Sequence, residues 1–296
     1  MLFSRSPLKR FTQPVALFVI PALLMLVPLT VRAQSSFDHG RPGQLSKQKA
    51  ADVLNEFRSF RVRDFCFRIT ITHVPKKNGA ETVHYGTMWG SWNNNGPVFR
   101  IELTPAKASP AAPLRFILQS GPRPALWIAG ENGKPVRTVA NTNEPLAPGL
   151  IISALELQQQ FTYWANARYL ETRRFRGRPT NFFRMTPPAS FRTAHPNIGH
   201  VTLGFDRAFP SALMQAVVHD ANGRELRKVE LESFTKAQDN YIPEEIRMHD
   251  MVTRDKDIFR ITAASLKQPN PPTVFDPATL GSPAPTPPEN LFEVIN

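Results

Sequence analysis

The sequence predicts a mainly β protein with a few helices, built around a long and strongly curved antiparallel sheet. Between Ala165 and Leu266, short runs rich in apolar, β-branched and aromatic residues alternate with turn signals that contain glycine, asparagine or aspartate. These turns recur roughly every 10 to 12 residues, a spacing that favours an antiparallel meander over a βαβ fold. The chain before and after this region supports the same class, element by element.

The N-terminus has the pattern of a secretory signal peptide. Basic residues precede an apolar run over 15–29, and a small-x-small cleavage site ends at Ala33. The apolar stretch over 11–31 approaches the length of a membrane span, so a retained anchor is the alternative, although two prolines interrupt it. We expect a signal peptide at 1–33 that is cleaved after Ala33, a flexible leader at 34–45, and a soluble chain in the periplasm.

Composition and charge fit one globular domain over 46–266. A hydrophobic content of 41% is enough for a core, and the formal net charge is +12. In an exported protein this basic excess points to anionic lipid surfaces or acidic partners, and not to nucleic acid. The one cysteine, Cys66, lies within a strand pattern and can form no intramolecular disulfide, so we expect a buried structural thiol.

One helix and five strands are expected after the leader. Ser46 can cap a helix over 46–60, whose apolar residues recur at helical spacing. Apolar residues then alternate with mostly polar ones from Phe65 to Thr72, which is typical of a half-buried strand. Four further strands are expected at 83–92, 98–103, 114–118 and 125–128.

The segment 141–164 interrupts the strands. Its apolar residues fit an amphipathic helix over 150–164, which Ser153 can cap, and glutamines favour helix over strand. Such a helix between two sets of curved strands can plug an open barrel. An ordinary core helix that packs on the sheet explains the pattern equally well.

Seven strands make up the meander, and a proline-rich tail follows it. The strands are expected at 168–175, 180–186, 201–205, 213–219, 226–234, 242–251 and 258–264, with a longer loop at 187–199. Eight prolines follow Leu266 and disfavour packed structure. We therefore expect a disordered tail over 267–296.

The sequence contains no catalytic or metal-binding signature. It lacks a nucleophile elbow, a metalloprotease motif, a glycine-rich phosphate loop and a cysteine pair for zinc. His195 and His200 lie in one loop without a third ligand, and His219 and His249 are expected to be ordinary strand-face histidines. We expect no catalytic residue, no metal and no cofactor.

The strongest polar feature is an arginine-rich hairpin around Gly177. Arg174, Arg176 and Arg178 are its candidate contact residues. A solvated hairpin that protects a sheet edge from aggregation is the favoured interpretation. The functional alternative is contact with an anionic headgroup or an acidic partner, which guanidinium groups suit.

An ordered series of motifs between Tyr169 and Asp255 resembles the outer-membrane lipoprotein-sorting (LolA-like) family. The series comprises Tyr169-Leu170-Glu171, Arg176-Gly177-Arg178-Pro179, Met185-Thr186-Pro187, Val201–Asp206, Asp220–Arg224, Phe234-Thr235-Lys236, Tyr241–Met248 and Thr253-Arg254-Asp255. The resemblance implies an open, strongly curved antiparallel half-barrel with helices that close its mouth. It also implies that acyl chains are held there in transit through the periplasm.

The expected function is that of a periplasmic, monomeric, non-enzymatic carrier or binding protein for lipid or lipoprotein acyl chains, with transient membrane-surface contact. An envelope protein-interaction or sensor module without lipid cargo is the alternative. The expected cavity lining is Phe65, Phe67, Ile69, Ile71, Trp89, Phe99, Ile101, Leu103, Phe116 and Leu118 from the strands, with Leu150, Ile151, Leu155 and Phe161 from the plug. Sequence alone does not separate an open pocket from a sealed core.

Overall fold

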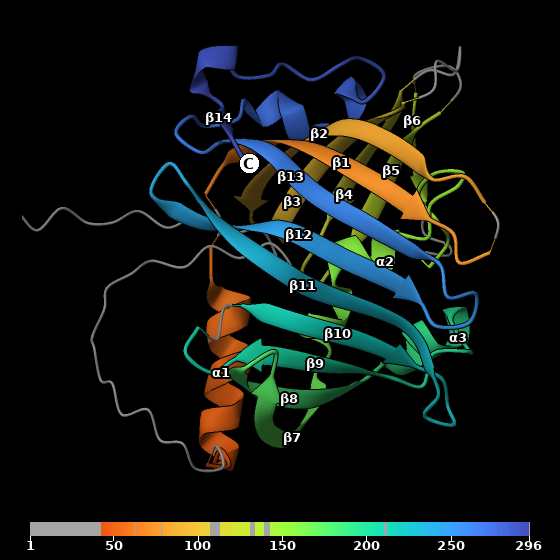
Figure 1. Cartoon of the computed structure of the whole chain (residues 1–296), viewed down its shortest axis with the longest axis vertical. Helices are drawn as coiled ribbons and strands as arrows, with labels where there is room; N and C mark the ends of the chain where they lie inside the picture. Colours follow the sequence, from red (N-terminus) through yellow and green to blue (C-terminus); the bar gives the residue numbers. More distant parts are fainter. Residues whose placement is uncertain are drawn as a thin grey trace, which may run out of the picture.

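The strands form one long antiparallel sheet, which curves around a concave side (Figure 1). Their side chains alternate between the concave and the convex face. The computed structural model describes residues 43–61, 63–77, 79–106, 113–130, 134–138, 143–209 and 212–295. The expected signal peptide at 1–33 and the leader up to residue 42 lie outside the described residues. No helix within the described ranges is both long and apolar enough to cross a membrane.

Two meanders meet at the centre of the sheet, where β1 pairs with β13. The first consists of β1 (Phe65–Val74), β2 (Thr82–Asn93), β3 (Gly96–Pro105), β4 (Leu114–Gln119), β5 (Ala125–Ala129) and β6 (Pro135–Thr138). The second consists of β7 (Asn166–Phe175), β8 (Arg178–Thr186), β9 (His200–Asp206), β10 (Leu213–His219), β11 (Glu225–Ala237), β12 (Asn240–Asp250) and β13 (Lys256–Ser265). All the strands expected from the sequence are present, and β6 is an addition.

The topology leaves the sheet open. Strands β6 and β7 are consecutive in the chain but form the two opposite edges. The segment that joins them therefore has to cross the open side of the curved sheet. This arrangement confirms the expected half-barrel and places the segment over 143–165 where a plug would lie.

Helix α1 (Lys47–Ser59) forms as expected. The Ser46 hydroxyl accepts a hydrogen bond from the Lys49 N–H at 3.3 Å, which caps the first turn. The apolar stripe of the helix is buried, and Phe57 packs edge-on against Phe205 of β9 with 4.8 Å between ring centroids. The end of the leader also has fixed contacts, because the Leu45 N–H donates to the Tyr169 hydroxyl at 3.2 Å.

We call residues 150–164 the plug, and its helix is shorter than expected. The plug contains α2 (Ala154–Gln158) followed by the 3-10 turn η1 (Gln160–Tyr163). Gln159, between them, has a left-handed backbone with φ 49°, and this residue ends the α-helix. The expected cap is present, because the Glu156 carboxylate accepts from the N–H of Ser153 at 2.9 Å and from its hydroxyl.

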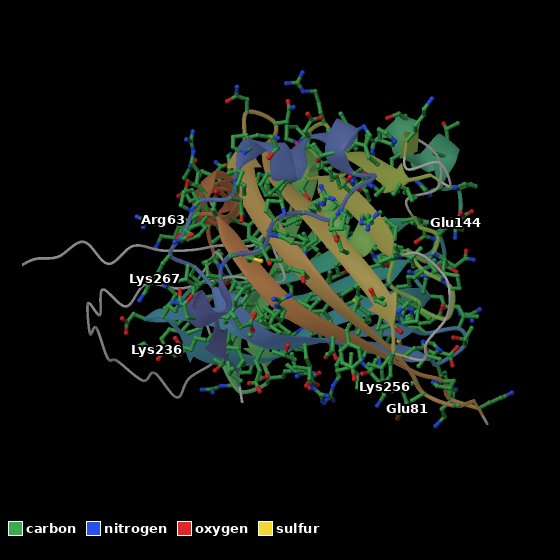
Figure 2. The ribbon with its side chains drawn as sticks, turned by 90° about the horizontal axis from the view of Figure 1, so that it is seen from above. Arg63, Glu81, Glu144, Lys236, Lys256 and Lys267 are labelled. Carbon is green, nitrogen blue, oxygen red and sulfur yellow. The ribbon has the colours of Figure 1, made fainter. Side chains whose placement is uncertain are left out.

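The expectation of a disordered tail is wrong, and Leu266 does not mark the end of the packed domain. Residues 267–295, here called the C-terminal arm, run over the convex face of β1–β4 (Figure 2). The arm contains η2 (Pro272–Phe275), η3 (Pro277–Thr279), η4 (Glu289–Leu291) and β14 (Glu293–Val294), and β14 pairs with β13. Prolines do exclude long helices and ladder strands. The arm nevertheless keeps its carbonyl acceptors, and Arg100, Arg115 and Trp89 of the sheet supply donors to them.

Candidate functional site

The concave face of the half-barrel carries the main core of the protein. Twelve of the expected lining residues belong to this one cluster, and none of them exposes more than 4% of its surface. They are Phe65, Phe67, Ile69, Ile71, Phe99, Ile101, Leu103, Phe116, Leu118, Leu150, Leu155 and Phe161. Ile151 packs against the cluster and is partly buried. In this conformation the apolar face is sealed by the plug together with α1, whose buried residues belong to the same cluster.

Trp89 was assigned to the wrong face. It pairs with Cys66 across β1 and β2, whereas its neighbour Met88 pairs with Phe67 of the concave core. Residues directly opposite one another share a face, so Trp89 points to the convex side. There it packs with Cys66 and Val274, and its indole N–H donates to the Pro285 carbonyl at 3.0 Å.

Two charged side chains, the buried Asp257 and the partly buried Arg227, fix the plug to the sheet. One carboxylate oxygen of Asp257 accepts from the N–H groups of Ile151 and Ile152, both at 2.8 Å, and the other lies 2.8 Å from His73 Nδ1. Arg227 on β11 donates to the Ile151 carbonyl at 2.8 Å and to the Glu156 carboxylate at 3.0 Å. Burial raises the pKa of Asp257 despite these contacts. Hydrogen bonds from Gln158 to the Gln119 and Ala125 carbonyls and from Arg58 to the Thr162 and Trp164 carbonyls hold the other end, and apolar packing holds the middle.

A cavity of about 500 Å³ opens beside the other end of the plug. It lies between the β4–β5 turn, the end of α2 with η1, and the short helix α3 (Ala189–Ala194), which forms within the loop expected at 187–199. Its walls are Gly121, Pro122, Pro124, Ala125, Leu126, Gln158, Gln160, Tyr163, Trp164, Ala165, Pro188, Ser190, Phe191, Ala194 and His195. We call it the mouth pocket. None of these described lining residues is an acid, a lysine or an arginine.

Aromatic side chains join the mouth pocket to the concave core. Trp164 packs on Phe191 with 4.9 Å between ring centroids, and Phe191 packs on the imidazole of His195 at 4.4 Å. Leu126, Trp164 and Phe191 also belong to the core cluster. Burial lowers the pKa of His195, which keeps the ring neutral at neutral pH. No direct signal for this pocket is present in the sequence, because α3 is a helix of only 6 residues after two prolines.

The arginines of the hairpin face carboxylates of the same chain. Arg176 pairs with Glu230 at 3.2 Å and with Glu232, and Arg178 pairs with Asp206. Arg174 donates to the Gly177 carbonyl at 3.1 Å. Hydrogen bonding to Glu232 is the main reason that the pKa of Arg176 is raised. The carboxylates lie on β11 and β9, so these pairings tie the hairpin to neighbouring strands, and they leave contact with an external anion as an untested prediction.

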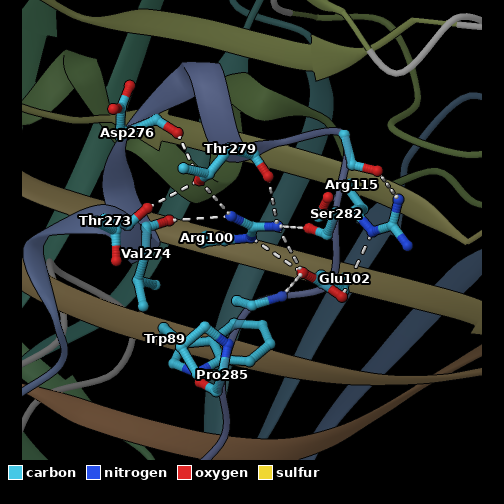
Figure 3. Close-up of polar contacts among 12 residues, drawn as sticks. Trp89, Arg100, Glu102, Arg115, Thr273, Val274, Asp276, Thr279, Ser282 and Pro285 are labelled. Atoms are coloured by element: carbon cyan, nitrogen blue, oxygen red, sulfur yellow. Dashed lines mark hydrogen bonds and ion pairs between the residues drawn. The ribbon is translucent and has the colours of Figure 1, made fainter.

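Arg100 is the most deeply buried charge on the convex face, and it anchors the C-terminal arm (Figure 3). Its guanidinium donates to the carbonyls of Val274 at 3.3 Å and of Ser282, and to the Thr279 hydroxyl at 3.1 Å. Glu102 lies 2.9 Å from the same guanidinium and accepts from the Ala284 N–H of the arm at 2.8 Å. Along β3 the side chain of Arg100 lies on the face opposite Phe99 and Ile101, and there the arm covers it.

The histidines form no metal site in the described part of the chain, where no three potential ligands converge. His219 stacks on His200 of the neighbouring strand, with ring centroids 4.3 Å apart and an angle of 4° between the ring planes. The Cys66 thiol is buried as expected, and burial raises its pKa to about 12.

Comparison with known proteins identifies the architecture. No family model and no curated protein matches the chain. A putative outer membrane lipoprotein-sorting protein domain from Vibrio parahaemolyticus superposes with a TM-score of 0.64 at 9% identity, over 79% of this chain and 97% of that one. A DUF1329 family protein from Desulfovibrio piger gives 0.64 at 8% identity, over 79% and 98%. A LolA superfamily protein from Nitrosomonas europaea gives 0.56 at 14% identity, over 78% and 98%.

These identities are too low to transfer a function, but the coverage includes almost the whole of each similar domain. The chain has a LolA-like fold.

Proposed function

We propose that the protein is an exported, non-enzymatic carrier or binding protein for lipid or lipoprotein acyl chains, which it holds against the concave face of the half-barrel. The observation that carries the proposal is the construction of the plug. An uninterrupted apolar face lies beneath a segment that contains only one short α-helix and one 3-10 turn. Movement of this segment exposes a binding surface without breaking the ladder of the sheet.

The energetics suit an acyl cargo. Each methylene that leaves water contributes roughly 0.8 kcal/mol, so a chain that replaces plug side chains on the concave face recovers much of the lost packing. The hydrogen bonds of Asp257 and Arg227 make the closed state specific and set how readily the plug moves. The protein acts as a monomer in the periplasm, with brief contacts at a membrane surface and no nucleic-acid partner.

A protein-interaction or sensor module without lipid cargo is the second candidate. The sealed interior and the ordered C-terminal arm favour this second candidate. A module that binds its partner through its outer surface requires a closed core and a fixed surface, and it requires no internal cavity. The two candidates differ in whether the interior ever opens to a ligand.

Uptake of a fluorescent acyl chain by the purified protein tests the proposal. In Arg227→Met the plug loses its contacts with the Ile151 carbonyl and with Glu156, so we expect faster uptake than in the wild type. Lys228→Met is the matched control, because Lys228 is the next residue on β11 and pairs with Glu230 away from the plug. Absence of uptake by all three proteins would reject the carrier and favour the interaction module.

A further inference from the structure

The mouth pocket contains a polar feature that the rest of the concave side lacks. Three consecutive glutamines, Gln158–Gln160, lie where α2 passes into η1, and all three are buried. Glutamine is usually exposed, so a run of three in a buried turn requires a chemical reason. The position of the run, at the wall of a cavity of about 500 Å³, suggests that the reason is a ligand.

The amide of Gln158 has a fixed orientation. Its Nε2 donates to the carbonyls of Gln119 at 3.1 Å and of Ala125 at 2.7 Å, so the nitrogen has to face β4 and β5. The amide oxygen consequently faces away from these carbonyls. The side chain has an exposure of 0%, and yet this oxygen accepts no hydrogen bond from the described residues.

Two further polar atoms in the same region share this property. The Gln159 amide oxygen and the Ser120 hydroxyl are buried without a hydrogen-bond partner among the described residues. Ser120 directly precedes Gly121, which lines the pocket. Each unpaired buried group costs roughly 1–3 kcal/mol. Of these three residues Gln158 is the one that lines the pocket, and its unpaired oxygen is unfavourable unless a bound molecule supplies a donor.

The remaining wall sets the character of that molecule. The rings of Trp164 and Phe191 and the side chain of Leu126 are apolar, and His195 is neutral. No lysine or arginine among the described lining residues is available to neutralise a carboxylate or a phosphate. Burial of an anion against such a wall is costly, whereas an uncharged donor meets the free acceptor of Gln158.

We infer that the mouth pocket binds the head of an uncharged amphiphile that carries a hydrogen-bond donor, a hydroxyl or an amide N–H. The donor bonds to the Gln158 amide oxygen, and the first part of the acyl chain packs on Trp164 and Phe191 toward the core. The inference rests on the proposed function and specifies its cargo: neutral donor-bearing lipids are preferred to anionic ones.

Four probes with the same twelve-carbon chain test the inference by calorimetry or by competition with a fluorescent acyl chain. Monolaurin supplies hydroxyl donors, lauramide supplies an amide donor, methyl laurate has no donor, and laurate is anionic. We expect monolaurin or lauramide to bind about tenfold more tightly than methyl laurate and laurate, which is the factor that 1.4 kcal/mol represents. The stronger of the two identifies the source of the donor.

Two variants connect this preference to the pocket. Ala194→Trp fills the pocket from its exposed side and should weaken binding of the preferred probe, whereas Arg192→Trp, on the same helix but outside the lining, should not. Gln158→Met removes the acceptor and should abolish the ratio between donor-bearing and donor-free probes while apolar binding remains. The ratio of the affinities for donor-bearing and donor-free probes does not change if the variant merely contains less folded protein, because both affinities are measured on the same sample.

The outcomes separate this inference from the carrier function. If methyl laurate binds as tightly as monolaurin and lauramide, or if Ala194→Trp behaves like Arg192→Trp, the unpaired acceptors bind water alone and the inference is overturned, while the carrier function stands. If no probe binds at all, both are overturned.

Discussion

Replacement of Arg100 by methionine is expected to release the C-terminal arm from the convex face without unfolding the sheet. The guanidinium contacts Val274, Thr279 and Ser282 of the arm, and methionine keeps the length of the side chain but donates to none of them. Removal of one partner from a buried charged network costs about 3–5 kcal/mol. Glu102 keeps Arg115 as a partner 3.6 Å away, so the lower end, about 3 kcal/mol, applies here.

Cys66 reports the release directly. The thiol packs with Trp89 beneath Val274 of the arm, and burial raises its pKa to about 12, so it is protonated and unreactive while the arm is bound. A loss of about 3 kcal/mol corresponds to roughly a 100-fold larger population of the released arm. We therefore expect alkylation of Cys66 by iodoacetamide at pH 8 to accelerate by about this factor. The chain has one cysteine, which makes the signal unambiguous.

Arg260→Met is the control for the Arg100 variant. Arg260 lies on β13 and pairs with Glu245 at 2.6 Å, and its side chain is half exposed. Glu245 keeps Arg247 as a partner at 2.6 Å, so loss of this half-exposed pair should change stability by less than about 1 kcal/mol, and Cys66 should stay protected. Circular dichroism verifies that both variants keep the sheet. If Cys66 in a folded Arg100→Met protein is as protected as in the wild type, Arg100 does not anchor the arm.

Three further predictions concern the ends and the surface of the protein. The mature chain should begin at Gln34, which N-terminal sequencing of the periplasmic fraction checks; recovery of the uncleaved chain in the membrane contradicts it. The pKa of His200 is lowered to about 4, first by burial and then by the neighbouring imidazole. An unfolded histidine titrates near pH 6.5, so the free energy of unfolding should fall as the pH drops from about 6.5 to about 4. His200→Gln should reduce that fall in urea titrations at pH 7 and pH 5, and an unchanged difference contradicts the assignment. Substitution of Arg174, Arg176 and Arg178 by glutamine should leave co-sedimentation with anionic vesicles unchanged at low salt, because internal partners already contact these groups; a clear loss of binding would restore the headgroup contact.

Much of the fold could be predicted from local patterns. Alternation with a period of two marked the strands, and the cap at Ser46 marked the start of α1. Trp89 was misplaced because the face of a strand residue depends on register with its neighbour, and a shift of one residue reverses every side chain. The plug was predicted too long because Gln159 adopts a left-handed backbone that nothing in its local pattern requires.

The larger failures have a common physical origin in long-range contacts. Composition predicts disorder in the C-terminal arm because the arm cannot form a core of its own. Its order comes from donors about 180 positions earlier, of which Arg100 is the main one; Arg100 Nη1 and Thr279, for example, are separated by 179 residues in sequence. The mouth pocket likewise forms from three segments far apart in the chain. Only the buried glutamine run was visible in sequence, and it indicated a helix.

Native mass spectrometry of the protein purified from its own periplasm tests the carrier function most directly. A carrier should give a species heavier than the mature chain by the mass of a lipid, released on collisional activation and identified by its fragments. Loss of that adduct in Ala194→Trp, with its retention in Arg192→Trp, would place the lipid head in the mouth pocket. A wild-type protein that carries no lipid under conditions that preserve the fold would contradict the account and leave the interaction module as the function.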